Sequence, residues 1–401
     1  MVENKLAYNI SDSFNKLKAY CESEAYKGWD PYDGLNSKIF NALPFKHWDL
    51  ARLAWIQGFK RSPINFRKIL LVPKEYNAMG IGLFLLGYCR LYEVALKGNY
   101  DFGSAEDLLK KIKELTKLLL DLRSEGYSGS CWGYNFDWQA RRLFLFKKNT
   151  PTVVATCFCV EALLESYEIT KDTSVLKKAL TAANFVTDDL SRTAHKKGII
   201  FSYSIKDGNN TVINASLLGA KILSYSYKYH KNKEHADLAK QAVIAACDLQ
   251  EQDGSWIYGL LPIQSWKDSF HTGFNLDAIA TYQQNTGDTT FQSYIDKGLN
   301  FYLNNFFEKD GVPKYYHNKT YPIDIHCPGQ LIVTLSKLKE IHSYTDLIPK
   351  VLNWTIKNMQ DNKGYFYYQY RKGLSSKISY MRWSNAFMFN AMAHYLKETT
   401  A

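Results

Sequence analysis

The feature that most restricts the fold is a helical unit that recurs about every 55 residues. Between Gln250 and Tyr282 the sequence contains the end of a helix, an Asp253-Gly254 turn, an aromatic loop and the start of an apolar helix. Gly254 suits a helix end because glycine readily takes the left-handed backbone conformation found there. Helices that follow such loops are expected to begin near residues 77, 152, 213, 271, 324 and 382.

Six helical hairpins predict a closed ring, because hairpins that close on themselves need no polar capping repeat at either end. We therefore predict an all-α fold, an (α/α)6 toroid with an N-terminal helix and long loops at one mouth. An open α-solenoid is the alternative. The expected organisation is a single domain over residues 1–401, with an N-terminal helix and loop at 1–37 and six hairpins at 38–401.

Charge and cysteine content restrict the partners and the compartment. The 401 residues carry 50 basic and 39 acidic side chains, a net charge of +11, which favours an acidic partner. Lysines are spread along the chain without a dense arm, so nucleic acid is not the expected partner. Seven cysteines, most of them in apolar helical segments, are typical of reduced intracellular thiols. With no apolar signal core and no expected transmembrane segment, the protein is predicted to be cytoplasmic.

In a toroid the loops that precede the six inner helices meet at one mouth, where the helix N-termini carry partial positive charge. Such a mouth favours an anionic or polyhydroxylated ligand. Aromatic residues make up 15% of the chain, and the predicted mouth loops are rich in them, as in a glycan groove. Arg141 belongs to the same loops. The candidate substrate-binding residues are Trp132, Tyr134, Trp138, Tyr203, Trp256, Tyr258, Trp266, Arg382, Trp383 and Asp33.

The candidate catalytic residues are ionisable groups in the same loops. His271 opens a helix, where the helix dipole favours the neutral imidazole that a general base needs. The structural alternative is that His271 only caps the helix. Asp324 and His326 lie two residues apart at another helix start, where Asp324 is alternatively an N-cap. The predicted catalytic set is His271, Asp324, His326, Asp137 and Tyr315.

The roles of Arg382 and of the pair Asp30 and Asp33 each have a structural alternative. Arg382 is expected to bind a carboxylate or, alternatively, to pair with a buried aspartate. Asp30 and Asp33 either contribute to the site or form a turn. Asp137, surrounded by aromatic residues, is a candidate desolvated general acid.

Several motifs are absent from the sequence, including GxxxxGK[ST], HExxH and GxSxG, and no GxGxxG follows a strand. The pair Cys157 and Cys159 does not have zinc-ligand spacing. We therefore expect no metal and no cofactor. Residues 250–256 match one Q-x3-G-x-W motif, as in squalene–hopene-type cyclases, but no DxDD acid accompanies it. A terpenoid cyclase or prenyltransferase-like enzyme is thus the weakest alternative.

Six segments resemble the VpsJ-like polysaccharide biosynthesis proteins of bacterial capsule, exopolysaccharide and O-antigen gene clusters. They are GWDPYDGLNS (28–37), SFHTGFNLDAI (269–279), KDGVPKYY (309–316), YPIDIHCPGQ (321–330), NWTIKNMQD (353–361) and YMRWSNAFMFNAMA (380–393). The resemblance implies a role in surface polysaccharide formation. More distantly, the expected toroid is similar to heparinase-type lyases and to the helical domain of glucuronyl C5-epimerases, which use tyrosine and histidine on uronic acids.

These observations leave three kinds of activity open. A lyase or C5-epimerase would use Arg382 to neutralise a uronate, with His271 or a tyrosine removing a proton and His326 or another tyrosine supplying one. A glycoside hydrolase would use Asp137 and Asp324. A non-catalytic protein would only bind or assemble glycans. In each case the expected partner is a polysaccharide or lipid-linked oligosaccharide, most plausibly anionic.

Overall fold

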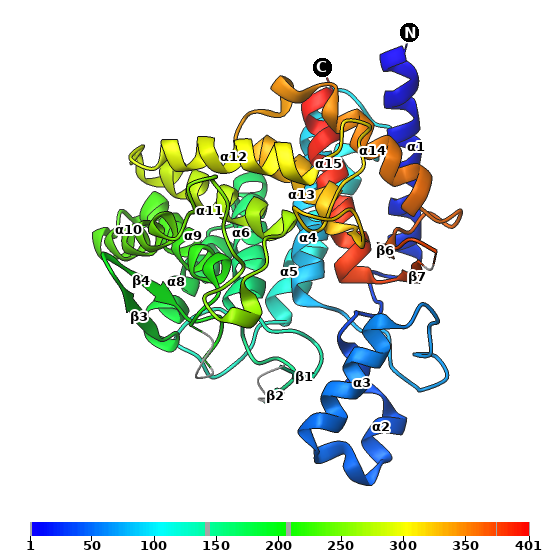
Figure 1. Cartoon of the computed structure of the whole chain (residues 1–401). Coiled ribbons are helices and arrows are strands. Elements are labelled where there is room, and N and C mark those ends of the chain that lie inside the picture. Colours follow the sequence, from blue (N-terminus) through cyan, green and yellow to red (C-terminus); the bar gives the residue numbers. More distant parts are fainter. Residues whose placement is uncertain (1, 141–144, 206–209, 374, 401) are drawn as a thin grey trace.

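The computed structural model describes residues 2–140, 145–205, 210–373 and 375–400. Helices dominate it, and they alternate between an inner and an outer layer (Figure 1). The inner helices are α4 (Ala78–Leu96), α6 (Val153–Thr170), α9 (Ile213–His230), α11 (Ser269–Thr286), α13 (His326–Lys337) and α15 (Phe387–Thr399), the last preceded by the π-helical turn η6 (Met381–Ala386). The outer helices are α1 (Val2–Ser23), α5 (Ala105–Asp121), α7 (Thr173–Leu180) with α8 (Ala182–Asn184) and the π-helical turn η3 (Phe185–Asp189), α10 (Lys233–Asp248), α12 (Gln292–Phe306) and α14 (Leu347–Met359).

The inner helices close a ring. Each packs against the next one along the chain, and α15 packs against α4. The predicted (α/α)6 toroid is therefore confirmed, and the contact between α15 and α4 excludes the open solenoid. The inner helices are buried on nearly all sides, whereas α5 buries one apolar stripe and exposes a charged face, as expected of an outer helix.

A glutamine–glycine pair joins successive repeats of the ring. Gln250 donates from Nε2 to the carbonyls of Gly254 and of Tyr294 on α12, each at 2.9 Å. A Cβ on Gly254 would lie 2.4 Å from the carbonyl oxygen of Lys297, so glycine is needed for this close approach. The Q-x3-G motif noted in the sequence is thus a link to the next outer helix, which removes the main support for a cyclase.

The same link identifies α1 as an outer helix of the ring. Gln360 donates to the carbonyls of Gly364 and of Ser13 on α1, each at 2.9 Å. A Cβ on Gly364 would lie 2.2 Å from the carbonyl oxygen of Lys16. Therefore α1 follows α14 around the ring just as α12 follows α10. The expectation that an N-terminal helix stands apart from six hairpins in residues 38–401 is wrong in this respect. The assignment of the whole chain to one domain stays a prediction.

Residues 33–74 leave the ring between α1 and α4, and we call them the excursion. It contains η1 (Asp33–Asn36), α2 (Lys38–Ala42), η2 (Pro44–His47) and α3 (Asp49–Arg61), and it projects below the ring in Figure 1. A separate small cluster of Leu35, Phe40 and Ile56 forms its core. Helix α3 packs against η1, η2 and β1.

Three small antiparallel sheets stabilise the loops near the inner helix starts. One pairs β1 (Trp138–Gln139) with β2 (Leu145–Phe146), and another pairs β3 (Arg192–His195) with β4 (Gly198–Phe201). The third has the order β5 (Ile323–Asp324), β6 (Tyr367–Tyr370), β7 (Ser376–Ser379). A short 3-10 turn, η4 (Pro262–Gln264), precedes α11, and η5 (Ile341–Tyr344) precedes α14.

Across the described part of the chain, only α4 is long and apolar enough to cross a membrane by length and hydropathy. Of its most apolar window, 83% is buried inside the ring. The apolar character of α4 is therefore accounted for by its contacts with α5, α6 and α15.

Candidate functional site

Each of the six segments that lead into an inner helix contributes an aromatic side chain to a common cluster, which we call the mouth. Two direct contacts join members from different segments. The Tyr134 and Tyr203 hydroxyls are 3.1 Å apart, and the ring centres of Tyr32 and Trp383 are 5.6 Å apart. The predicted meeting of the loops is therefore present. The six side chains are Tyr32, Tyr134, Tyr203, Tyr258, Tyr315 and Trp383.

The first ionisable pair of the mouth is Asp268 with His271, at the start of α11. Asp268 is the N-cap, and its carboxylate accepts from the backbone N–H of His271 at 3.0 Å. The same carboxylate lies 2.8 Å from His271 Nδ1 and accepts from the indole of Trp266 at 2.9 Å. The His271 side chain is 20% exposed and lies against Tyr258, with ring centres 4.6 Å apart.

The second pair is Asp324 with His326, at the start of α13. Asp324 Oδ1 lies 3.2 Å from His326 Nδ1 and accepts from the Trp383 indole at 3.1 Å, and Oδ2 accepts from Gln369 at 2.9 Å. Both side chains are almost fully buried. Burial lowers the pKa of His326, although Asp324 opposes this shift. His326 is therefore neutral at neutral pH.

Both histidines contact one phenyl ring. The ring centre of Phe270 lies 4.2 Å from that of His271 and 4.9 Å from that of His326. In each pair Nδ1 is directed at a carboxylate, which selects the tautomer with the hydrogen on Nδ1 and leaves Nε2 with a free lone pair. The mouth thus holds two imidazoles that are oriented to accept or donate a proton through Nε2.

The mouth tyrosines are held as neutral phenols. Burial raises the pKa of Tyr203 and Tyr315 well above the usual value, and the carboxylates of Asp268 and Asp324 add to the shift at Tyr315. Burial also raises the pKa of Tyr258. A phenol in this state is a hydrogen-bond donor and not a base at neutral pH. The role of Tyr315 as a catalytic residue stays a prediction.

Arg382 lies beside the buried histidine pair and is held by a buried carboxylate. Its Nε donates to Asp30 Oδ2 at 2.6 Å, and its guanidinium lies 5.0 Å from the ring centres of both Tyr134 and Trp383. Within the described residues, no hydrogen bond involves its two terminal nitrogens. Arg382 is thus both an ion-pair partner, the structural alternative given above, and a donor available to a ligand.

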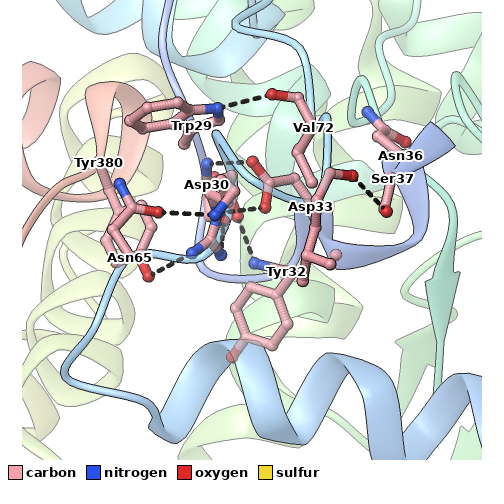
Figure 2. Close-up of polar contacts among 12 residues, drawn as sticks. Trp29, Asp30, Tyr32, Asp33, Asn36, Ser37, Asn65, Val72 and Tyr380 are labelled. Atoms are coloured by element: carbon pink, nitrogen blue, oxygen red, sulfur yellow. Dashed lines mark hydrogen bonds and ion pairs between the residues drawn. The ribbon is translucent and has the colours of Figure 1, made fainter. Parts of the chain in front are cut away.

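Figure 2 shows the loop that carries Asp30 and Asp33. A second buried arginine, Arg67, fixes this loop. Arg67 donates from Nε to Asp33 at 2.6 Å, from Nη1 to the Tyr380 hydroxyl at 3.0 Å and from Nη2 to the carbonyl of Asp30 at 2.7 Å. Asp33 also accepts from the backbone N–H of Asp30 at 2.9 Å. This network makes Asp33 a structural residue, so its predicted role in substrate binding is wrong.

Two other predicted binding residues also lie in the core. Trp132 and Trp256 are 0% and 2% exposed. Each indole donates to a backbone carbonyl of the preceding outer helix, Trp132 to Leu119 at 2.8 Å and Trp256 to Ala246 at 2.9 Å. These contacts give both indoles a packing role, and their role in substrate binding stays a prediction, because sequence alone does not distinguish a packed indole from one that faces the mouth.

The remaining predicted residues are accounted for individually. Trp138 is half-buried on β1 near Tyr203, and Trp266 stacks on Tyr258 with ring centres 4.6 Å apart. Asp137 accepts from the backbone N–H of Lys148 at 2.7 Å, which makes it a loop-closing residue of the β1–β2 hairpin. Arg141 lies outside the described residues.

Three residues of the mouth were missed from the sequence as site candidates. Asp268 could have been found as the capping carboxylate three residues before His271. Tyr32 comes from the loop just before the excursion, where no pattern in the sequence indicates that its ring reaches Trp383. Gln369 reaches Asp324 only because β6 pairs with β5, which places Gln369 opposite Asp324.

Neither a protein-family model nor a curated protein matches this sequence. A cellobiose 2-epimerase from Bacillus thermoamylovorans B4167 superposes with a TM-score of 0.59 at 13% identity, over 82% of this chain and 90% of the epimerase. An unsaturated glucuronyl hydrolase specific for heparin superposes with a TM-score of 0.57 at 14% identity, over 80% and 87%. A family 76 glycoside hydrolase (mannosidase) from Bacteroides thetaiotaomicron VPI-5482 gives 0.59 at 10% identity, over 98% of both chains.

The chain has the six-hairpin toroid fold of these enzymes. The resemblance to the VpsJ-like proteins stays a prediction, because no family model matches.

Proposed function

We propose that the protein is a carbohydrate epimerase that transfers protons at a carbon next to a carbonyl group. The observation that carries this proposal is the presence of two carboxylate-paired histidines, from neighbouring inner helices, in contact with one phenyl ring. Inversion of such a carbon needs a base on one face and an acid on the other. The mouth holds two oriented imidazoles, one from α11 and one from α13, and so meets this requirement.

In the proposed reaction, Nε2 of one histidine takes the proton from the sugar carbon. The electron pair of the C–H bond moves into the carbon–carbon bond next to the carbonyl, whose oxygen becomes negatively charged. The other histidine, which enters the reaction as the imidazolium with a proton on both nitrogens, then gives its Nε2 proton to the opposite face of the same carbon and becomes neutral. One proton leaves and one returns, so the reaction needs neither an oxidant nor a cofactor.

The negative oxygen is stabilised by donors that the mouth already holds in place. The terminal nitrogens of Arg382 and the phenol hydroxyls of Tyr258 and Tyr315 are the available groups. Such fixed donors act most strongly on charge that develops during the reaction. The carbonyl is either the open-chain aldehyde of a reducing sugar or the carboxylate of a uronate residue, and both have the same proton chemistry.

A glycoside hydrolase is less well supported by this geometry. Burial disfavours the ionised form of Asp324, but its hydrogen bonds from His326 and Gln369 outweigh burial and lower the pKa of Asp324. A carboxyl group with a lowered pKa is a poor general acid. Asp137 is already bonded to the backbone of Lys148. The pair expected from the sequence for hydrolysis therefore lacks a proton donor.

The biological setting is proposed from the sequence resemblance. A cytoplasmic role in forming a bacterial surface polysaccharide, with an anionic polysaccharide or lipid-linked oligosaccharide as substrate, agrees with the VpsJ-like segments and with the net charge of +11. The fold neighbours include a cellobiose 2-epimerase and a hydrolase specific for heparin, so neutral and anionic saccharides are both tested below.

The test is incubation in heavy water with a panel of reducing disaccharides and of uronate polymers. We expect deuterium to enter one ring carbon of the product, seen by NMR, together with a change of configuration at that carbon. His271→Gln and His326→Gln are the matched variants, and both should lose the exchange. Absorbance at 232 nm without exchange would indicate a lyase. Release of monosaccharide without exchange would indicate a hydrolase, and either result would overturn the proposal.

A further inference from the structure

The excursion exposes an unusual number of large apolar side chains. Of the eleven large hydrophobic residues that are exposed in the described residues, seven lie between positions 39 and 71. Trp48, Leu50 and Ile69 are 68%, 70% and 74% exposed. Soluble surfaces rarely gather exposed apolar residues in this way unless a partner covers them. The seven residues are Ile39, Trp48, Leu50, Ile64, Phe66, Ile69 and Leu71.

The same segment carries most of the net positive charge. Residues 33–74 contain eight lysines and arginines and two acidic residues, Asp33 and Asp49, so they account for +6 of the net +11. The charge is therefore less evenly spread than the sequence analysis assumed. Some of these cations are paired, such as Arg67 with Asp33 and Arg52 with Asp49. Lys38, Arg61 and Lys68 are exposed beside the apolar residues.

We propose that the excursion docks on the surface of a lipid bilayer that contains anionic lipids. Exposed Trp, Phe, Ile and Leu side chains next to lysine and arginine are the combination that binds the headgroup region of a membrane. The cations are attracted to the anionic headgroups, and the apolar side chains enter the boundary with the acyl chains. A nucleic acid would use the cations but would leave Ile64, Ile69 and Leu71 in water.

Because the excursion contacts residues of the mouth loops, its docking would also fix the position of the mouth. Arg52 on α3 donates to Gln139 on β1 at 2.7 Å, and Lys60 on the same helix donates to the hydroxyl of Tyr32 at 2.5 Å. A docked excursion would therefore hold the mouth close to the membrane surface. If the proposed carbohydrate chemistry is correct, this placement favours a saccharide that is still attached to a membrane lipid.

The docking is tested by sedimentation with vesicles, which needs no catalytic activity. The full chain is mixed with vesicles of phosphatidylcholine alone or with 30 mol% phosphatidylglycerol, in low and high salt. We expect binding to the anionic vesicles only, weakened by salt. The charge variant Arg61→Glu/Lys68→Glu should bind more than about tenfold more weakly. Its matched control, Lys177→Glu/Lys178→Glu on α7, makes the same change of charge on exposed lysines and should bind at least threefold better than the charge variant.

The apolar contribution has its own matched pair. Trp48→Ser/Leu50→Ser should weaken binding about tenfold or more, whereas Leu96→Ser/Tyr100→Ser removes residues of similar exposure, 64% and 63%, at the other end of the ring. Circular dichroism and thermal unfolding check that all four variants are folded. Equal binding of the excursion variants and their controls would overturn the proposal, as would no binding to either vesicle.

A different occupant would give a different result. If the excursion joins two copies of the chain, light scattering would show a dimer that the Trp48→Ser/Leu50→Ser variant abolishes, with no vesicle binding, and the membrane proposal would be wrong. Proton exchange on a soluble saccharide is measured in the same variants and should stay within about twofold of the parent. Failure of the membrane proposal is therefore distinguishable from failure of the proposed function.

Discussion

The two carboxylate–histidine pairs of the mouth have the same chemistry in different surroundings. Asp268 and His271 lie at the edge of the mouth, where the imidazole is 20% exposed. Asp324 and His326 lie deeper, where the imidazole is 3% exposed and its carboxylate is also bonded to Trp383 and Gln369. The difference is one of solvent access, because both histidines direct Nδ1 at a carboxylate.

This comparison indicates how one mouth can supply two proton-transfer groups that are not equivalent. Burial keeps His326 neutral before the reaction, so its Nε2 is free to accept a proton from the substrate, and its small exposure limits exchange of that proton with water. An imidazole at the edge of the mouth exchanges its proton with solvent more readily. We therefore expect His326 to face the side of the reacting sugar carbon that is shielded from water, and His271 to face the side that is open to solvent.

The largest expected effect is loss of activity when either histidine is removed. His271→Gln and His326→Gln should each lower kcat/KM by about 10²- to 10⁴-fold, because each removes one of the two proton-transfer groups. Steady-state kinetics on the substrate found by proton exchange would measure this. Retention of activity within tenfold in one variant would mean that a single histidine serves both faces.

The next largest expected effect is a loss of stability when Arg382, which lies beside the buried pair, is replaced. Arg382→Ala leaves Asp30 buried without its partner, so it should lower the free energy of unfolding by about 3–5 kcal/mol. Chemical denaturation is the measurement. The buried ion pair with Asp30 at 2.6 Å makes loss of stability the expected result. An unchanged stability would return Arg382 to a purely ligand-binding role.

A smaller effect is expected from the carboxylates that orient the histidines. Asp268→Asn and Asp324→Asn should each lower kcat/KM about 10- to 100-fold, because the amide can no longer hold the productive tautomer. Each double variant with its own histidine should lose little more than the histidine variant alone. Additive losses in Asp324→Asn/His326→Gln would show that the two residues do not act as a unit.

The smallest expected effect is a pH dependence of the free energy of unfolding that comes from the buried pair, Asp324 and His326. Burial lowers the pKa of His326 below its value in the unfolded chain, so the unfolded state takes up a proton first as the pH falls. The stability that the neutral imidazole provides is therefore complete above pH ~6.5 and is lost as the pH falls through the folded pKa. Denaturation between pH 7.5 and 5 should show a shallower decline for His326→Gln than for the parent chain. A variant of the exposed His47, His47→Gln, should decline as the parent does, and a decline in His326→Gln as steep as the parent's would contradict this assignment.

Some of the site was predictable from local sequence, as the histidine pairs show. His271 and His326 follow helix-start signals, and the residues two or three positions before them are the carboxylates that pair with them. Trp132 and Trp256 have the same kind of loop sequence, yet they are core residues, because the direction of an indole depends on the outer helix behind it. Tyr32 lies in a loop more than two hundred residues before the two histidines in the sequence. No local pattern in the sequence indicates that its ring reaches the mouth.

By itself the sequence determined the repeat of apolar helices and favoured a ring, and the contact between α15 and α4 then excluded an open solenoid. Apolar helices that each expose a face too large for one partner must pack against neighbours on both sides, and six of them close without a free end. Only the tertiary structure decided that α1 completes the outer layer, that Asp33 is tied to Arg67 and that the excursion stands at the mouth. Those outcomes depend on contacts between segments distant in sequence, whose geometry no local pattern of residues specifies.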